Sequence, residues 1–286
     1  MATTLLTSRA MLASVRAASP VFIVGVMNRC GTNYLSHVLR LHPVFKLPGR
    51  IVEDYLLEHS DLLVRYVEKT GRSWGQSTSV ERRVFREQLL SRIGDGILAF
   101  LGDQIDEGRR VLAKTPSARH LENFFRLFPH AQLVILVRDG RDVVESAGRS
   151  WRYAPGAYWM ERWASGARAI LRFMDETGGQ DRGWSWTLVK YEDLIRDPER
   201  VVRELLAFLD VDESAFNWSG LQSIPLRGSS VHRGSRDRVH WDVVEKPDEF
   251  QPIGRWQHWH WAKRRIFKVV AGRELIRFGY VVNSRW

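Results

Sequence analysis

The sequence has 286 residues, of which 44% are hydrophobic and 27% are charged; this balance is typical of globular proteins and argues against a disordered chain. The formal net charge of +10 at pH 7 favours anionic partners as a class, which includes nucleotides, nucleic acid, acidic glycans and anionic lipid. The single cysteine, Cys30, excludes an intrachain disulfide and gives no sign of an oxidising compartment, so we expect a cytoplasmic protein.

The N-terminal segment, residues 1–19, is rich in Ser, Thr and Ala and contains two arginines but no acid. We expect it to be disordered, with a transit peptide as the alternative, and we expect one domain over residues 20–286. The first acidic residue of the whole chain is Glu53. No apolar run approaches the ~18–20 residues that a membrane helix needs, so we expect no membrane span.

Strands and helices alternate along the rest of the chain. Apolar runs predict buried strands at Val21–Val26 and Leu133–Val137, with shorter strand candidates at Arg110–Ala113 and Trp186–Val189. Helical periodicity marks residues 32–41, 53–68, 80–107, 121–128, 139–149, 157–175, 197–209 and about 259–278. This alternation predicts a single α/β domain with a central, mostly parallel sheet flanked by helices. Residues 220–256 lack clear periodicity and are expected to form a long functional loop.

A glycine-flanked turn, Gly25–Asn33 with the sequence GVMNRCGTN, joins the first buried strand to a helix. The N-terminus of a helix offers unpaired backbone N–H groups and the positive end of a dipole, which suits an anion. The turn is nearly a Walker loop, but five residues separate its glycines and no lysine follows Gly31. The cation lies inside the loop, at Arg29. The loop therefore suits an anion other than Mg-ATP, with a purely structural turn as the alternative.

A second polar element follows the other long buried strand, at Arg138 to Ser146. Ligands of open parallel sheets bind at the carboxyl ends of the strands. Ser146 lies eight residues after Arg138, two turns into the predicted helix, so the two side chains can bracket one phosphate. Arg141 and Asp142, between them, are expected to form local salt bridges.

These two motifs resemble those of the sulfotransferase family, and further similar elements follow in order from about residue 20 to residue 280. They are Lys114-Thr115-Pro116, Val189–Pro198, Leu226–Ser230 and Gly254-Arg255-Trp256. The resemblance implies a P-loop NTPase-like fold with a phosphosulfate-binding loop. It also implies in-line transfer of a sulfuryl group from 3′-phosphoadenosine 5′-phosphosulfate (PAPS) to a hydroxyl acceptor. The product would be adenosine 3′,5′-bisphosphate (PAP), and the family does not require a metal.

The resemblance also assigns roles in binding the donor. The loop residues would hold the 5′-phosphosulfate, although Asn33 departs from the usual threonine. Arg138 and Ser146 would hold the 3′-phosphate, and a later loop would close over it. Tyr191 would approach the adenine, with a core aromatic as the alternative. The full implied set is Arg29, Cys30, Gly31, Thr32, Asn33, Arg138, Ser146, Tyr191, Arg227, Gly228 and Ser229.

The implied reaction needs cations and a base. Negative charge builds on the oxygen that bridges to the leaving phosphate, and Arg29 and Lys114 are the candidate cations. Members that sulfate phenols and steroids use a histidine where this chain has Pro116. Members that sulfate tyrosine or sugars more often use a glutamate about twenty residues after the loop. Glu53 fits that place and is the candidate base, with Asp54 as the fallback and a structural carboxylate at a helix N-terminus as the alternative.

Two other functions remain open. One is a P-loop kinase or other nucleotide phosphoryltransferase, which would need Mg-ATP; the other is a non-enzymatic basic protein that binds anions. For a sulfotransferase we expect a small-molecule, glycan or lipid hydroxyl acceptor, no nucleic-acid partner and no metal. The sequence defines neither the acceptor nor the oligomeric state. Trp256, Trp259 and Trp261 are expected to pack in a core, with stacking on sugar rings as the alternative.

Overall fold

The computed structural model describes residues 19–75, 78–151, 153–178, 183–224 and 251–286. The predicted disorder of residues 1–19 lies outside this range except for its last residue. The predicted donor-binding residues Arg227, Gly228 and Ser229, and most of the long loop at 220–256, also lie outside it.

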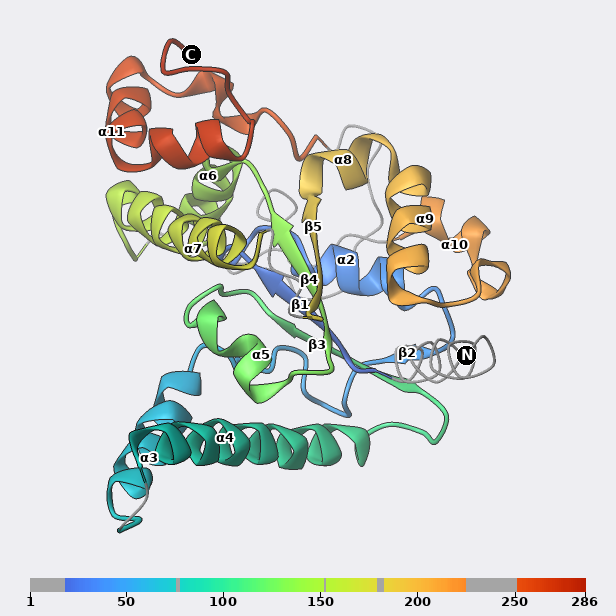
Figure 1. The fold of residues 1–286 in the computed structure, drawn as a ribbon. Coiled ribbons are helices and arrows are strands. Elements are labelled where there is room, and N and C mark those ends of the chain that lie inside the picture. The colour runs from blue at the N-terminus through green and yellow to red at the C-terminus, as the bar shows by residue number, and fades with distance from the viewer. Residues whose placement is uncertain (1–18, 76–77, 152, 179–182, 225–250) are drawn as a thin grey trace, which may run out of the picture.

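The centre of the fold is a five-stranded sheet in the order β2-β3-β1-β4-β5 (Figure 1). Every pair of neighbouring strands is parallel, so all carboxyl ends point to one edge of the sheet. The strands are β1 Val21–Gly25, β2 Phe45–Lys46, β3 Arg110–Thr115, β4 Gln132–Val137 and β5 Ser185–Lys190. The parallel sheet predicted from the buried runs is confirmed, and β2, which has only two residues, is the strand that the apolar pattern did not reveal.

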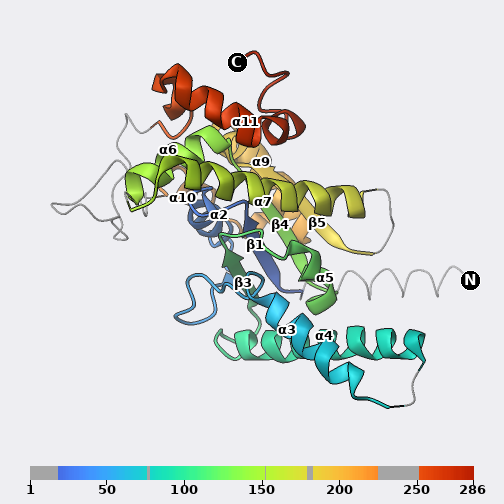
Figure 2. The same ribbon diagram turned by 90° about the vertical axis from the view of Figure 1, so that its left-hand side faces the viewer.

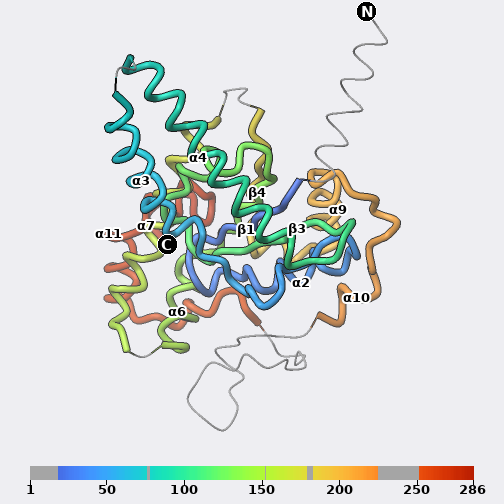
Figure 3. The backbone as a smooth tube through the Cα atoms, turned by 90° about the horizontal axis from the view of Figure 1, so that it is seen from below, coloured from blue at the N-terminus to red at the C-terminus, as the bar shows by residue number. Residues whose placement is uncertain are grey.

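Helices cover both faces of the sheet: α5 and α7 lie on one face, and α2 and α9 lie on the other (Figures 1 and 2). The view from below shows α3 and α4 side by side, and α11 packs on α7 (Figure 3). The described α-helices are α2 Thr32–Leu39, α3 Ser60–Arg72, α4 Ser79–Gly102, α5 Phe124–Leu127, α6 Gly140–Ser150, α7 Gly156–Thr177, α8 Tyr191–Arg196, α9 Pro198–Leu209, α10 Trp218–Gln222 and α11 Trp261–Arg277. Short 3-10 turns are η1 Leu121–Asn123, η2 Glu213–Ala215 and η3 Arg255–His258.

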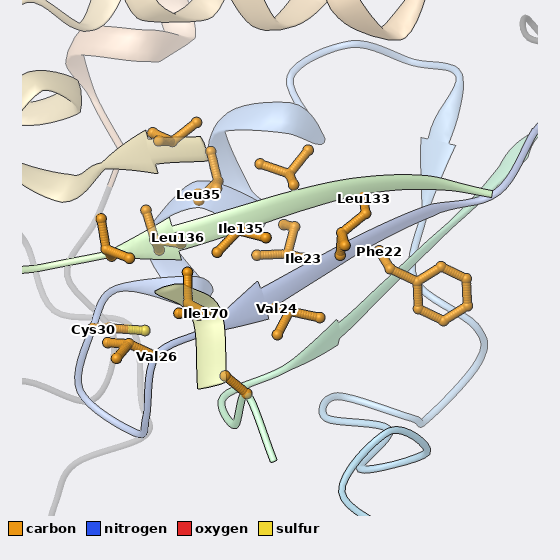
Figure 4. Close-up of a cluster of buried hydrophobic side chains, with 14 of the residues drawn as sticks. Phe22, Ile23, Val24, Val26, Cys30, Leu35, Leu133, Ile135, Leu136 and Ile170 are labelled. Carbon is orange, nitrogen blue, oxygen red and sulfur yellow. The ribbon is translucent and has the colours of Figure 1, made fainter. Parts of the chain in front are cut away.

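The core forms where these helices meet the sheet. Ile23 of β1 and Ile135 of β4 are fully buried, and Leu35 of α2 and Ile170 of α7 join the same cluster (Figure 4). Central strands that are covered on both faces need apolar side chains on both faces, which explains the unbroken apolar runs of β1 and β4. The packed sheet gives the polar loops at its carboxyl edge a rigid support.

The helix predicted over 53–68 is wrong at its beginning, because α3 starts at Ser60. Asp54 is held in a loop by a tertiary contact, since its carboxylate accepts hydrogen bonds from the Thr115 hydroxyl and the Leu56 N–H. Tyr55 has a φ of 50°, which is the left-handed region and stops a right-handed helix. Glu53 is therefore a loop residue, and its alternative role as a helix-terminal carboxylate is excluded.

Other boundaries follow local capping. The capping box of Thr78 and Glu81 starts α4, which ends at Gly102 and not at the predicted residue 107. Asp197 caps α9 as its sequence predicts, and its side chain accepts a hydrogen bond from the Arg200 N–H. The last helix begins at Trp261, two residues later than predicted, where the His260 side chain provides the cap.

Candidate functional site

The glycine-flanked loop lies between β1 and α2, at the carboxyl edge of the sheet. Gly25 ends β1 in tight contact with Cys30 and Thr32, because a Cβ at Gly25 would lie 2.4 Å from the Cys30 Sγ. Cys30 is fully buried, its backbone N–H donates to the Met27 carbonyl, and burial raises the pKa of its thiol to about 11. Its side chain therefore packs the loop onto the core. Thr32 is also buried, whereas Asn33 is partly exposed in the first turn of α2.

Gly31 is the N-cap of α2 and has a φ of 108°, a conformation that favours glycine. The ring of Tyr191 lies directly against it, and a Cβ at Gly31 would come within 2.4 Å of the ring. In the described residues no side chain caps α2, and its first turn contains no acid. The N–H groups at this helix end therefore remain available to an anion.

Two arginines meet over this loop. The Arg29 Nε donates to the Ser146 hydroxyl at 3.2 Å. The Arg138 guanidinium donates to the Arg29 carbonyl at 2.8 Å and to the Pro252 carbonyl at 2.6 Å. The Nε of Arg138 is buried and has no hydrogen-bond partner among the described residues. The structure thus brings Arg29, Arg138 and Ser146 together.

Tyr191 lies at the start of α8, directly after β5, and is buried. The Arg138 guanidinium lies 4.5 Å from the centre of its ring. Burial raises the pKa of Tyr191, and nearby Arg138 opposes that change. The ring therefore packs in the core and also contacts Arg138. A core position does not exclude the predicted approach to the adenine.

Arg255 is a third cation of the cluster, and no role was assigned to it from the sequence. Its pKa is lowered to about 10 by burial and then by Arg138, and Arg29 is likewise lowered to about 10 by burial, then by Arg138 and Arg255. These effects on pKa indicate that the guanidinium groups of Arg29, Arg138 and Arg255 lie close enough to repel one another. A bound anion would stabilise such a cluster of like charges, which makes it a candidate anion site.

Asp142 holds the backbone on either side of Arg255. Its carboxylate accepts hydrogen bonds from the backbone N–H groups of Gly254 at 2.8 Å and Trp256 at 3.3 Å. Among the described residues Asp142 forms no salt bridge, contrary to the prediction, and its carboxylate instead holds the turn that begins η3. The predicted local salt bridge of Arg141 is confirmed, with Asp139 at 2.6 Å. The Arg141 guanidinium also lies 3.7 Å from the centre of a Trp256 ring.

The other two tryptophans of this region differ. Trp259 is buried, as predicted, and its indole N–H donates to Glu145. Trp261 is 67% exposed, so its predicted place in the core is wrong. It is the first residue of α11, whose buried residues begin at Phe267.

Glu53 and Lys114 form a pair beside the loop. The Lys114 Nζ lies 3.5 Å from the Glu53 Oε1. Lys114 is almost fully buried, whereas 20% of the Glu53 side chain is exposed. Burial lowers the pKa of Lys114, and Glu53 opposes this effect. In such a pair, the buried ammonium can stabilise negative charge on a transferred group, and the partly exposed carboxylate can accept a proton.

The Asp54 carboxylate makes hydrogen bonds that hold the local backbone. Its Oδ1 accepts from the Thr115 hydroxyl at 2.6 Å and from the Leu56 N–H at 2.9 Å. Burial raises the pKa of this carboxyl, although the bond from Thr115 opposes the change. Lys114 and Thr115 are consecutive in β3, so their side chains point to opposite faces of the sheet. The Asp54 Oδ1 is thus occupied on the side of Thr115, whereas Glu53 directly faces the Lys114 ammonium, and Glu53 is the better candidate base.

Sequence reasoning also missed Tyr55. The Tyr55 hydroxyl donates to the Glu53 Oε2 at 2.7 Å, and Asn28 of the loop lowers the pKa of Tyr55. Tyr55 has a left-handed backbone conformation, which leaves no pattern in the sequence of an ordinary residue.

The described residues contain no group of three or more His, Cys, Asp and Glu side chains that could hold a metal ion. Within the same residues, none of the helices combines the length and the apolar character of a membrane-spanning segment.

Comparison with known proteins agrees with this geometry. A sequence model of the sulfotransferase family matches residues 20–215. A protein-tyrosine sulfotransferase of Drosophila melanogaster is 24% identical over 252 residues, which cover 83% of this chain and 47% of that protein. Protein-tyrosine sulfotransferase A of Caenorhabditis elegans is also 24% identical over 252 residues, which cover 83% of this chain and 61% of that protein. The chain therefore spans about half the length of these curated relatives.

The fold is also found among solved structures. The sulfotransferase domain of the Synechococcus PCC 7002 olefin synthase superimposes with a TM-score of 0.50 at 22% identity, covering 88% of this chain and 94% of that domain. At this level of identity the similarity concerns the fold, and it confirms the predicted α/β architecture.

Proposed function

The chain belongs to the sulfotransferase family, and we propose that it transfers a sulfuryl group from PAPS to a hydroxyl acceptor and releases PAP. The observation that supports this activity most is the contact between Arg138 and Arg29 of the glycine loop, at the carboxyl edge of the sheet, with Arg255 near enough to lower the pKa of Arg29. PAPS carries anionic groups at both ends of its ribose, and a cluster of three cations is suited to such a ligand.

The residues of the cluster have separate roles in this proposal. Arg29 and the N-terminus of α2 hold the phosphosulfate, because both lie in the loop. Arg138, Ser146 and Arg255 hold the 3′-phosphate. The unpartnered Nε of Arg138 fits this role, because a phosphate oxygen would supply its missing acceptor.

Glu53 and Lys114 carry out the transfer in this proposal. The acceptor oxygen forms a bond to sulfur while the bond from sulfur to the bridging phosphate oxygen breaks, and that oxygen keeps the electron pair. The acceptor proton passes to Glu53. Lys114 and Arg29 stabilise the charge that develops on the bridging oxygen.

The acceptor is a hydroxyl compound, and a tyrosine phenol is the first one to test because the two curated relatives are protein-tyrosine sulfotransferases. Small-molecule, glycan and lipid alcohols remain the other acceptor classes. We also propose a cytoplasmic location, which the single cysteine favours.

The experiment is a transfer assay from radiolabelled PAPS to a panel of acceptors: tyrosine-containing peptides, phenols, sugars and lipid alcohols. We expect labelled product with at least one class, and Arg138→Ala is expected to abolish it. A parallel arm supplies Mg-ATP in place of PAPS. ATP consumption that is insensitive to PAP, with no transfer from PAPS, would contradict the proposal and favour a phosphoryltransferase.

A further inference from the structure

Tyr55 has a backbone conformation that is unusual for its residue type. Its φ is 50°, and a bulky side chain in the left-handed region costs roughly 1–3 kcal/mol. The chain keeps this conformation two residues after Glu53 and five residues before α3 begins. Such strain persists only where surrounding contacts over-determine it, so the contacts of Tyr55 show what it serves.

A short polar contact holds the Tyr55 side chain. The hydroxyl donates to the Glu53 Oε2 at 2.7 Å, which is a short bond to a carboxylate. Asn28 of the glycine loop has the opposite effect on the hydroxyl to that of Glu53, because it lowers the pKa of Tyr55. Burial and then Glu53 raise the pKa of Tyr55 to about 12, so the hydroxyl keeps its proton at neutral pH and remains a donor.

The two oxygens of Glu53 therefore face different groups. Oε2 is occupied by Tyr55, and Oε1 faces the Lys114 ammonium at the longer distance of 3.5 Å. A glutamate has three rotatable bonds, and a 3.5 Å contact alone holds it loosely. The short bond from Tyr55 fixes the plane of the carboxylate, which leaves Oε1 directed to the Lys114 side.

We propose that Tyr55 is a positioning residue: its hydroxyl orients the Glu53 carboxylate toward the transfer site. This inference rests on the proposed sulfuryl transfer, in which Glu53 takes the acceptor proton. A base acts only when its oxygen lies within hydrogen-bond reach of the proton that it removes. The strained backbone then has a role, because it turns the ring back onto Glu53.

The test compares four proteins: the wild type, Tyr55→Phe, Glu53→Gln and the double variant. The Phe variant keeps the ring and the backbone and removes only the hydroxyl. We expect kcat to fall roughly 10- to 100-fold, because a small misplacement of a reacting group has this effect. The KM for PAPS and the calorimetric Kd for PAP are expected to change less than about 3-fold, since donor contacts are retained.

The double variant separates positioning from general stability. If Tyr55 acts through Glu53, adding Tyr55→Phe to Glu53→Gln lowers kcat no further, whereas independent effects would multiply. Tyr66→Phe is the matched control, because Tyr66 is 60% exposed on α3, and its kcat is expected to equal that of the wild type.

Each outcome decides the inference. Wild-type kcat in Tyr55→Phe, or a further tenfold loss in the double variant, overturns the positioning role while the transfer activity stands. A wild type that binds PAP but transfers no sulfate to any acceptor of the panel overturns the proposed function and this inference together.

Discussion

Replacing Gly31 by alanine tests whether the close contact between the glycine loop and Tyr191 builds the site. Alanine disfavours the φ of 108°, at a cost of about 1–3 kcal/mol. Its Cβ would also lie 2.4 Å from the Tyr191 ring, and overpacking of this kind costs about 1–3 kcal/mol. Together these effects lower the free energy of unfolding by roughly 2–6 kcal/mol, a large part of the ~5–15 kcal/mol of a typical domain.

The assay is denaturant unfolding combined with calorimetric titration of PAP. We expect a lower unfolding midpoint and a PAP Kd at least tenfold weaker, because either Tyr191 or the loop must move. Tyr191→Ala is itself destabilising, because the ring is buried; in the double-mutant cycle we expect a favourable coupling of about 1–3 kcal/mol, since removal of the ring relieves the overlap and leaves the backbone strain.

Gly96→Ala is the matched control. Gly96 lies inside α4, and a Cβ there meets no atom within 4 Å, so alanine is expected to stabilise the protein by about 0.5–1 kcal/mol. If Gly31→Ala behaves like Gly96→Ala, in stability and in PAP affinity, the reasoning about this contact is refuted.

Three further predictions concern single side chains. Arg138→Met is expected to weaken PAP binding by roughly 10- to 100-fold in calorimetry, because charged hydrogen bonds are lost; unchanged affinity would exclude Arg138 from the site. Glu53→Gln is expected to lower kcat by roughly 10²- to 10⁴-fold at unchanged PAP affinity, and an active variant would remove Glu53 as the base. Burial alone would raise the pKa of Glu145, but hydrogen bonds from Trp259, Lys263 and Arg149 lower it from 4.5 to about 2. The stability that this carboxylate contributes is present above pH 4.5 and is lost as the pH falls toward about 2; we therefore expect acid unfolding curves of Glu145→Gln to lose pH dependence in this window, and identical curves would contradict the assignment.

The architecture could be predicted because its signals are local. The apolar runs of β1 and β4 and the glycines of the loop are read directly from the sequence, and the parallel sheet confirms them. The membership of the sulfotransferase family, inferred from motifs in a fixed order, is confirmed by the match over residues 20–215. The helix over 53–68 was wrong because a tertiary bond, from Thr115 to Asp54, decided the local structure.

The site was predictable only in part, because its missing members are placed by contacts between distant residues. Arg255 reaches the cluster because Asp142, more than a hundred residues earlier, holds the turn at Gly254. Tyr55 reaches Glu53 through a backbone conformation that its neighbours impose. Neither arrangement has a periodicity or a spacing that the sequence displays. The roles of the individual site residues remain predictions.

Calorimetric titration of the purified protein with PAP tests the central claim most directly, because it does not depend on knowing the acceptor. We expect saturable binding of one PAP per chain, with 5′-AMP binding at least tenfold more weakly because it lacks the 3′-phosphate that Arg138 and Arg255 would hold. The absence of saturable PAP binding would contradict the account.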